Sequence, residues 1–284
     1  MATLFLSACV QDASPPATPD PPTASAATGA GPSPSGPSST APSATSSPTT
    51  DPTSPATTTP TGPTPSSCAI PPELAGLDLE QLPLVGKQIA LTFDGGSNAD
   101  GVDLIVATLT ARHVPATFFL TGDFVRSFPV RAAAIGRSFL VGNHTDTHRD
   151  LTRLTAEQVR AELRGAHREI VAATGQDPRR FFRFPFGARD SRTVAMVNRR
   201  CYVAFRWTVD TLGWQGTAGG GSVARVVRRV LDAARPGAIV LMHVGAHPED
   251  GSTLDADALP IVIRRLRARG YSFVALSAVM SEAP

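Results

Sequence analysis

The chain has 284 residues and a formal net charge of +2, so it is long enough for a sizeable core and far from the charge of a nucleic-acid-binding protein. No stretch of 18 consecutive apolar residues occurs, which argues against a membrane-spanning helix. The glycines at 95 and 96 lack the spacing of a dinucleotide-binding loop, so we expect no nucleotide cofactor.

The N-terminal segment resembles a targeting signal. Residues 1–9 end in Leu-Ser-Ala-Cys, which resembles the lipobox of bacterial lipoproteins, in which the cysteine is lipidated, although the apolar run is shorter than in a complete signal peptide. Residues 10–67 hold 15 of the 26 prolines and consist mainly of Ser, Thr, Pro, Ala and Gly, so we expect a disordered tether. Together they predict an extracytoplasmic protein, either a cell-surface lipoprotein attached to the membrane only through Cys9, or one secreted into the cell wall.

Residues 68–284 have the composition of a folded domain. They hold all 26 basic residues and 21 of the 24 acidic ones, a balance that suits a weakly anionic partner such as the cell wall. Cys68 and Cys201 either form a disulfide bond or remain two buried thiols, and the sequence leaves both open.

Strands and helices alternate from residue 86 onward. The clearest helix begins at Thr155, which forms a capping box with Gln158, and ends at Gly175. Strands are predicted at 88–93, 116–122, 138–144, 181–186, 202–209, 238–243 and 272–276, and helices at 102–112, 123–135, 155–174, 223–234 and 259–269. About seven strands alternating with helices predict an α/β fold with a parallel sheet, either open or closed into a barrel.

Polar side chains follow nearly every predicted strand. In a parallel sheet the carboxyl ends of the strands meet at one edge, where chemistry collects. A single such residue is ordinarily a cap or a structural ion pair, but their repetition indicates a site. The set comprises Asp94, His144, His148, Arg183, Asp210 and His243.

Five segments resemble, in order, the motifs of the polysaccharide deacetylases, the NodB-homology group or carbohydrate esterase family 4. They are Thr92-Phe93-Asp94, residues 144–148 (HTDTH), 183–187 (RFPFG), 210–214 (DTLGW) and Leu241-Met242-His243. The resemblance covers roughly residues 86–280. It implies a distorted (β/α) barrel with fewer than eight strands and metal-dependent hydrolysis of N-acetyl, or sometimes O-acetyl, groups on polysaccharides.

The resemblance also implies roles for individual residues. His144 and His148 would hold a divalent metal, Zn²⁺ first and Co²⁺ or another ion otherwise. Asp94 would be the base that takes a proton from a metal-activated water, and Arg183 would hold it ionised. His243 would be the acid, oriented by Asp210. The backbone N–H of Phe186 would stabilise the oxyanion, and Trp214 and Leu241 would shape the acetyl pocket.

Two glycines depart from the family pattern. Gly95 stands where the family has a second aspartate that ligates the metal, and Gly213 stands where an aspartate commonly precedes the tryptophan. Two histidines are few for a catalytic zinc site, which normally has three protein ligands. Asp94, Asp100, Asp146 or additional waters would complete the shell, or the metal is weakly held or absent.

These features predict a deacetylase acting on N-acetylated sugars, with peptidoglycan preferred and chitin-type oligomers or acetylated xylan as variants. Hydrolysis of another amide, with altered or absent metal, is an alternative within enzymes. A carbohydrate-binding relic is the non-enzyme alternative, against which the retention of Asp94 and His243 argues.

Overall fold

The computed structural model describes residues 70–84 and 86–281, which belong to the second of two units of the chain, Pro60–Pro284. The lipobox-like segment, the predicted tether and Cys68 lie outside the described residues. Cys201 is in a disulfide bond. Within the part of the chain that the structure describes, no helix has the length and apolar character needed to cross a membrane.

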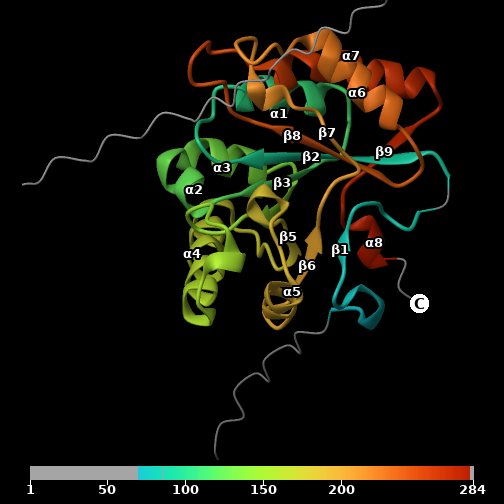
Figure 1. Cartoon of the computed structure of the whole chain (residues 1–284). Helices are drawn as coiled ribbons and strands as arrows, with labels where there is room; N and C mark the ends of the chain where they lie inside the picture. Colours follow the sequence, from blue (N-terminus) through green and yellow to red (C-terminus); the bar gives the residue numbers. More distant parts are fainter. Residues whose placement is uncertain (1–69, 85, 282–284) are drawn as a thin grey trace, which may run out of the picture. The chain divides into compact units, whose positions relative to one another are not determined.

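A curled, mainly parallel sheet forms the centre of the domain (Figure 1). Its strand order is β1-β6-β5-β4-β3-β2-β8-β7, with β9 also paired to β2, and every pairing between the named strands of the described residues is parallel. The strands are β1 (Asp78–Leu79), β2 (Gln88–Gly95), β3 (Thr117–Leu120), β4 (Leu140–Asn143), β5 (Arg180–Phe182), β6 (Tyr202–Phe205), β7 (Val209–Asp210), β8 (Ala238–His243) and β9 (Ser272–Val274).

The segment from β6 to β7 joins the two sides of the sheet. At its start β6 pairs with β5 and β1, and at its end β7 pairs with β8. Between them, Arg206 N–H donates to Leu79 O of β1, and Thr208 N–H donates to Ile239 O of β8. The sheet therefore curls into a distorted half-barrel, as the resemblance implied, but it has nine strands within the described residues and not about seven, because the prediction did not include the two-residue strands β1 and β7 as separate elements.

Helices cover the outside of this sheet in two groups (Figure 1). On one side α1 (Val102–Ala111) and α6 (Val223–Ala233) pack against α7 (Leu254–Ala268), and on the other α2 (Gly122–Ser127) and α3 (Pro129–Gly136) pack against α4 (Ala156–Thr174). Two further helices are α5 (Ser191–Asn198) and α8 (Ala278–Ser281). Because β2 is covered on both faces, seven of its eight residues are buried, and Asp94 is carried to its C-terminal end.

The helix boundaries agree with the predictions where capping residues mark them. Thr155 and Gln158 form the predicted capping box, and Gly175 ends α4 in the left-handed conformation. The single helix predicted at 123–135 is wrong, because Pro129 cannot continue a helix and starts α3 after Phe128. No element was predicted at β1, α5 or α8, and α7 begins at Leu254, five residues before its predicted start, with Pro260 inside the helix.

Gly142 tests the packing of β4 between its neighbours. A Cβ there would lie 2.7 Å from the Phe119 ring of β3 and 3.0 Å from Phe181 Cβ of β5. We expect Gly142→Ala to lower the free energy of unfolding by about 1–3 kcal/mol through overpacking. Gly96→Ala is the matched control, since nothing lies within 4 Å of its Cβ position. Urea unfolding of both variants measures this, and an unchanged stability of Gly142→Ala would contradict the described packing.

Candidate active site

The centre of the site is a buried ion pair between Asp94 and Arg183. Nη1 of Arg183 donates to Oδ1 of Asp94 at 2.6 Å, and the two side chains are 0% and 8% exposed respectively. Burial raises the pKa of Asp94, but the Arg183 guanidinium, with a smaller contribution from His243, outweighs it and holds the net pKa below its usual value. Asp94 is therefore ionised at neutral pH.

Arg183 is fully buried because the fold satisfies its remaining donors. Its Nε donates to Phe205 O at 3.1 Å, and its Nη2 donates to Thr92 Oγ1 at 2.9 Å and Arg206 O at 3.0 Å. Its guanidinium also lies 4.2 Å from the centroid of the Phe119 ring. These contacts join β2 to the β6–β7 segment across the interior and give the guanidinium one position.

His144 follows β4 and lies on the other side of the same carboxylate. Its Nδ1 is 2.8 Å from the carbonyl oxygen of Arg183, and its Nε2 is 3.3 Å from Oδ2 of Asp94. Burial lowers the pKa of His144 despite the nearby carboxylate, so the imidazole is neutral. A carbonyl can only accept, so Nδ1 carries the proton and Nε2 presents a lone pair.

His148 is brought beside His144 by a strained loop. Thr145 and His148 have positive φ angles of 69° and 57°, which non-glycine residues seldom adopt. The loop is held by Asn143 Oδ1, which accepts from Thr145 N–H, and by Glu162 of α4, which accepts from the N–H and hydroxyl of Thr147. The two imidazole centroids lie 4.8 Å apart, and burial lowers the pKa of His148 to about 4.

This arrangement fits a cation at the histidine pair. Nε2 of His144, which carries no proton in this tautomer, and Oδ2 of Asp94 face each other at 3.3 Å, so two acceptor atoms meet where a cation would be favoured. The carbonyl behind Nδ1 orients the imidazole in the way usual for metal-ligating histidines. Among the described residues, however, no three metal-ligating side chains converge closely enough for a complete site. The structure therefore offers a histidine pair beside a carboxylate.

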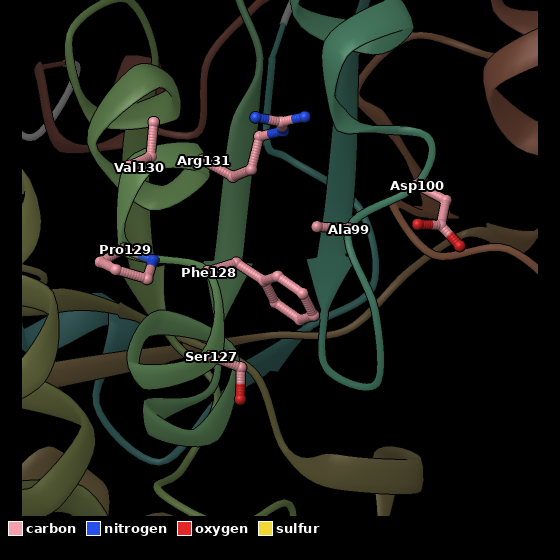
Figure 2. Close-up of a pocket in the computed structure, with 7 residues that line it drawn as sticks. All are labelled: Ala99, Asp100, Ser127, Phe128, Pro129, Val130 and Arg131. Atoms are coloured by element: carbon pink, nitrogen blue, oxygen red, sulfur yellow. The ribbon is translucent and has the colours of Figure 1, made fainter.

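The other candidates for a third ligand lie elsewhere. Asp146 accepts from Nη1 of Arg126 at 2.8 Å, and its carboxylate occupies the space that a Cβ on Gly122 or Gly165 would need. Asp100 is exposed and lines a surface pocket of about 460 Å³ with Phe128 and Arg131, and none of the predicted site residues lines that pocket (Figure 2). Of the three aspartates, Asp94 is the one in contact with His144.

His243 ends β8 directly beside Asp94 of β2, its Cα partner in the sheet register. Burial lowers the pKa of His243, but Asp255, Asp94 and Asp210 raise it, and the net pKa lies above the usual value. The carboxylate in contact with it is Asp255, whose Oδ2 is 3.6 Å from Nδ1. Asp210, the predicted orienting residue, instead accepts from Leu212 N–H at 2.8 Å and Trp214 Nε1 at 3.3 Å.

Three apolar residues predicted to contact substrate have different exposures. Phe186 is 70% exposed, adopts a φ of 59°, and its ring stands edge-on to His148 with centroids 4.6 Å apart. Trp214 is 49% exposed, with its ring 6.5 Å from that of His243, whereas Leu241 is buried in β8. Phe186 and Trp214 thus flank the histidines with accessible aromatic surface, and their contacts with substrate remain predictions.

Sequence reasoning missed four residues that hold the site: Thr92, Asn143, Glu162 and Asp255. Glu162 left a signal, because it lies on the apolar face of α4, three residues after Val159 and four before Ala166, where a charge needs a partner. Thr92 is one polar residue within an otherwise apolar strand, and Asp255 has the pattern of an ordinary acidic residue near a helix start. Neither pattern distinguishes these two from a structural residue.

Comparison with known proteins gives consistent matches. The family model for polysaccharide deacetylase matches residues 82–204. A chitooligosaccharide deacetylase of Bradyrhizobium sp. (strain ANU 289) is 37% identical over 196 residues, which are 65% of this chain and 87% of that protein. PdaA of Bacillus subtilis, a peptidoglycan-N-acetylmuramic acid deacetylase, is 29% identical over 197 residues, 69% of this chain and 72% of that protein.

Solved structures include both an enzyme and a pseudoenzyme. The structure of Bacillus subtilis PdaA, a family 4 carbohydrate esterase, matches with a TM-score of 0.67 and 27% identity over 75% of this chain and 87% of that one. BA3943 of Bacillus anthracis, described as a CE4 family pseudoenzyme, matches with a TM-score of 0.65 and 28% identity over 72% of this chain and 69% of that one. A mutant of BA3943 is described as having restored enzymatic activity.

Because Asp94 and Arg183 are both buried, we expect removal of one charge to destabilise the fold more than removal of both. Arg183→Met leaves a buried carboxylate without its partner, so we expect the free energy of unfolding to fall by about 3–5 kcal/mol. The double variant Asp94→Leu/Arg183→Met removes both charges and should recover more than about 1 kcal/mol of that loss. Chemical denaturation measures both, and a double variant no more stable than Arg183→Met would show that the two charges are not coupled.

Proposed function

Because the chain belongs to the polysaccharide deacetylase family, we propose that it is a hydrolase that removes N-acetyl groups from a cell-wall polysaccharide, with peptidoglycan-type sugars preferred. The observation that carries the proposal is the grouping of an ionised buried carboxylate, a histidine pair and His243 at the carboxyl ends of β2, β4 and β8. Hydrolysis of an amide needs a base for water and an acid for the leaving nitrogen, and this grouping supplies candidates for both.

In the proposed reaction Asp94 takes a proton from the attacking water as the new C–O bond forms at the acetyl carbon. Arg183 keeps the carboxylate ionised and directed at one position. The backbone N–H of Phe186 donates to the oxyanion that develops on the carbonyl, a type of contact worth about 3 kcal/mol. His243, with its raised pKa, donates a proton to the amine as the C–N bond breaks, leaving acetate and a free amino sugar.

We propose that His144 and His148 hold a divalent metal, most plausibly Zn²⁺, through their unprotonated ring nitrogens. Such an ion polarises a carbonyl and lowers the pKa of a water when bound. Asp94 faces the pair and is the candidate for a third ligand in addition to its role as base. With fewer protein ligands than the usual three, the site is expected to bind metal weakly.

The choice of substrate rests on the named relatives and the N-terminal sequence. The curated relatives act on chitooligosaccharides and on peptidoglycan. The lipobox-like Cys9 and the Ser/Thr/Pro-rich segment favour peptidoglycan over chitooligosaccharides as the substrate. An extracytoplasmic location is therefore part of the proposal. Acetylated xylan is the variant with an ester in place of the amide.

A carbohydrate-binding protein without turnover is the second candidate. Gly95 in place of a ligating aspartate and the similarity to a pseudoenzyme favour it. The ion pair that holds Asp94 ionised, and the location of His243 beside it, argue for the enzyme, because binding of a neutral sugar requires neither an ionised base nor a protonated acid.

Acetate release separates these candidates. The metal-free protein is incubated with N-acetylglucosamine oligomers and with purified peptidoglycan, before and after addition of Zn²⁺ or Co²⁺. We expect release that increases on metal addition and is lost on chelation. Binding of the oligomers without acetate release in any metal condition would establish the binding protein and overturn the deacetylase.

Gly95→Asp tests the metal site without relying on turnover. A Cβ at Gly95 would lie 2.9 Å from Cδ2 of Leu120 and 3.4 Å from the Phe124 ring, so the end of the Leu120 side chain must shift, and this overpacking costs about 1–3 kcal/mol. We expect Zn²⁺ affinity, measured by calorimetry, to increase at least about tenfold as a third ligand is added. Gly96→Asp adds the same charge one residue along and should change affinity less. Equal affinities of Gly95→Asp and the unaltered protein would contradict a metal at the histidine pair.

A further inference from the structure

Asp255 is a buried carboxylate that no motif of the sequence includes. It is the second residue of α7 and is 3% exposed. Its Oδ2 accepts from the backbone N–H of His243 at 2.8 Å and lies 3.6 Å from Nδ1 of the same residue. The carboxylate is thus seated against both the backbone and the ring of His243.

The imidazole and the carboxylate each have an unmet polar atom at this contact. Nδ1 of His243 and Oδ1 of Asp255 are both buried without a hydrogen-bond partner. Leaving a buried donor or acceptor unpaired costs about 1–3 kcal/mol, so a small rotation that pairs the ring with the carboxylate is favoured. Catalytic hydrogen bonds are often long in the absence of substrate and shorten in its complex.

The backbone at Gly213 makes room for this carboxylate. A Cβ on Gly213 would lie 2.3 Å from Oδ1, 2.5 Å from Cγ and 2.8 Å from Oδ2 of Asp255. The carboxylate therefore occupies the space that a side chain at position 213 would need. Position 213 is where the deacetylases that this chain resembles commonly carry an aspartate, immediately before the tryptophan.

We infer that Asp255 is the positioning residue for His243, and that it supplies from α7 the carboxylate that is missing at Gly213. The inference rests on the proposed function, since His243 needs orienting only if it donates a proton. Asp255 holds the Nδ1 side of the ring and leaves Nε2 to the substrate. Asp210 is engaged by Leu212 and Trp214 and acts on His243 only through its charge.

The first experiment separates the effect of the negative charge of Asp255 from the effect of its packing. Asp255→Asn retains the size of the side chain and an oxygen that can accept from His243 N–H, but it removes the charge. We expect kcat for acetate release to fall by about 10- to 100-fold, a usual effect of losing such an orienting partner, with KM changed less than about threefold. Asp257→Asn, an exposed position on the same turn of α7, is the matched control and should leave both constants within about twofold.

The second experiment transfers the carboxylate from position 255 to position 213. Gly213 has no positive φ, so an aspartate is sterically allowed there once Asp255 is truncated. The variant Gly213→Asp/Asp255→Ala should recover at least about tenfold in kcat over Asp255→Ala alone, which a merely structural role of Asp255 would not produce. Failure of this rescue in a folded double variant, or unchanged kcat in Asp255→Asn, overturns the inference.

An NMR measurement tests the contact between Asp255 and His243 independently of acetate release. The ¹⁵N shifts of the His243 ring, recorded without substrate, report which nitrogen carries the proton. We expect Nδ1 to be protonated in the unaltered protein, both in the neutral ring and in the imidazolium that donates from Nε2, with a change in the Nδ1 shift in Asp255→Ala and its reversal in the double variant. If no acetate is released from any substrate, the proposed function fails while these shifts still decide the contact. Identical shifts in all three proteins would overturn it.

Discussion

The buried contact between Asp94 and Arg183 is the interaction on which the rest of the site depends. A carboxylate at 8% exposure remains ionised only if a positive charge and hydrogen bonds replace the water that it loses. Arg183 supplies both, and its other donors are satisfied by Thr92 and by two carbonyls of the β6–β7 segment. The same residue's carbonyl oxygen orients His144. One arginine therefore couples the closure of the sheet to the ionisation of the base and to the direction of the histidine pair.

Two glycines, Gly95 and Gly213, lie where the resemblance to the deacetylase motifs leads us to expect aspartates. At Gly95 the space beside the backbone is limited by Leu120 and Phe124, and no carboxylate lies at the position where we expected a third metal ligand. At Gly213 the space is filled by Asp255, so another carboxylate has taken the position. The first change weakens the expected metal site, whereas the second preserves the surroundings of His243. Loss of a ligand and retention of the acid's environment favour an enzyme with a weakly held metal over a binding relic.

The sequence predicted the parallel sheet and the meeting of Asp94, His144, Arg183 and His243 because strand tips share an edge. It did not predict which carboxylate contacts His243, since α7 starts after a loop and its position is set by packing against α1 and α6. The break at Pro129 and the two-residue strand β1 were missed because short elements depend on tertiary contacts more than on local pattern. The loop from Thr145 to His148 was likewise beyond prediction, because its positive φ angles are maintained by Asn143 and by the distant Glu162.

The role of Asp94 as the general base is tested by measuring turnover and metal content on one sample of Asp94→Asn. An asparagine preserves the shape of the side chain but cannot take a proton from water. We expect a folded protein whose acetate release falls by about 10²- to 10⁴-fold, the usual contribution of a general base. Metal retained at the level of the unaltered protein would assign Asp94 as base alone, and metal lost would assign it as ligand also. Acetate release equal to that of the unaltered protein would contradict the central role of Asp94.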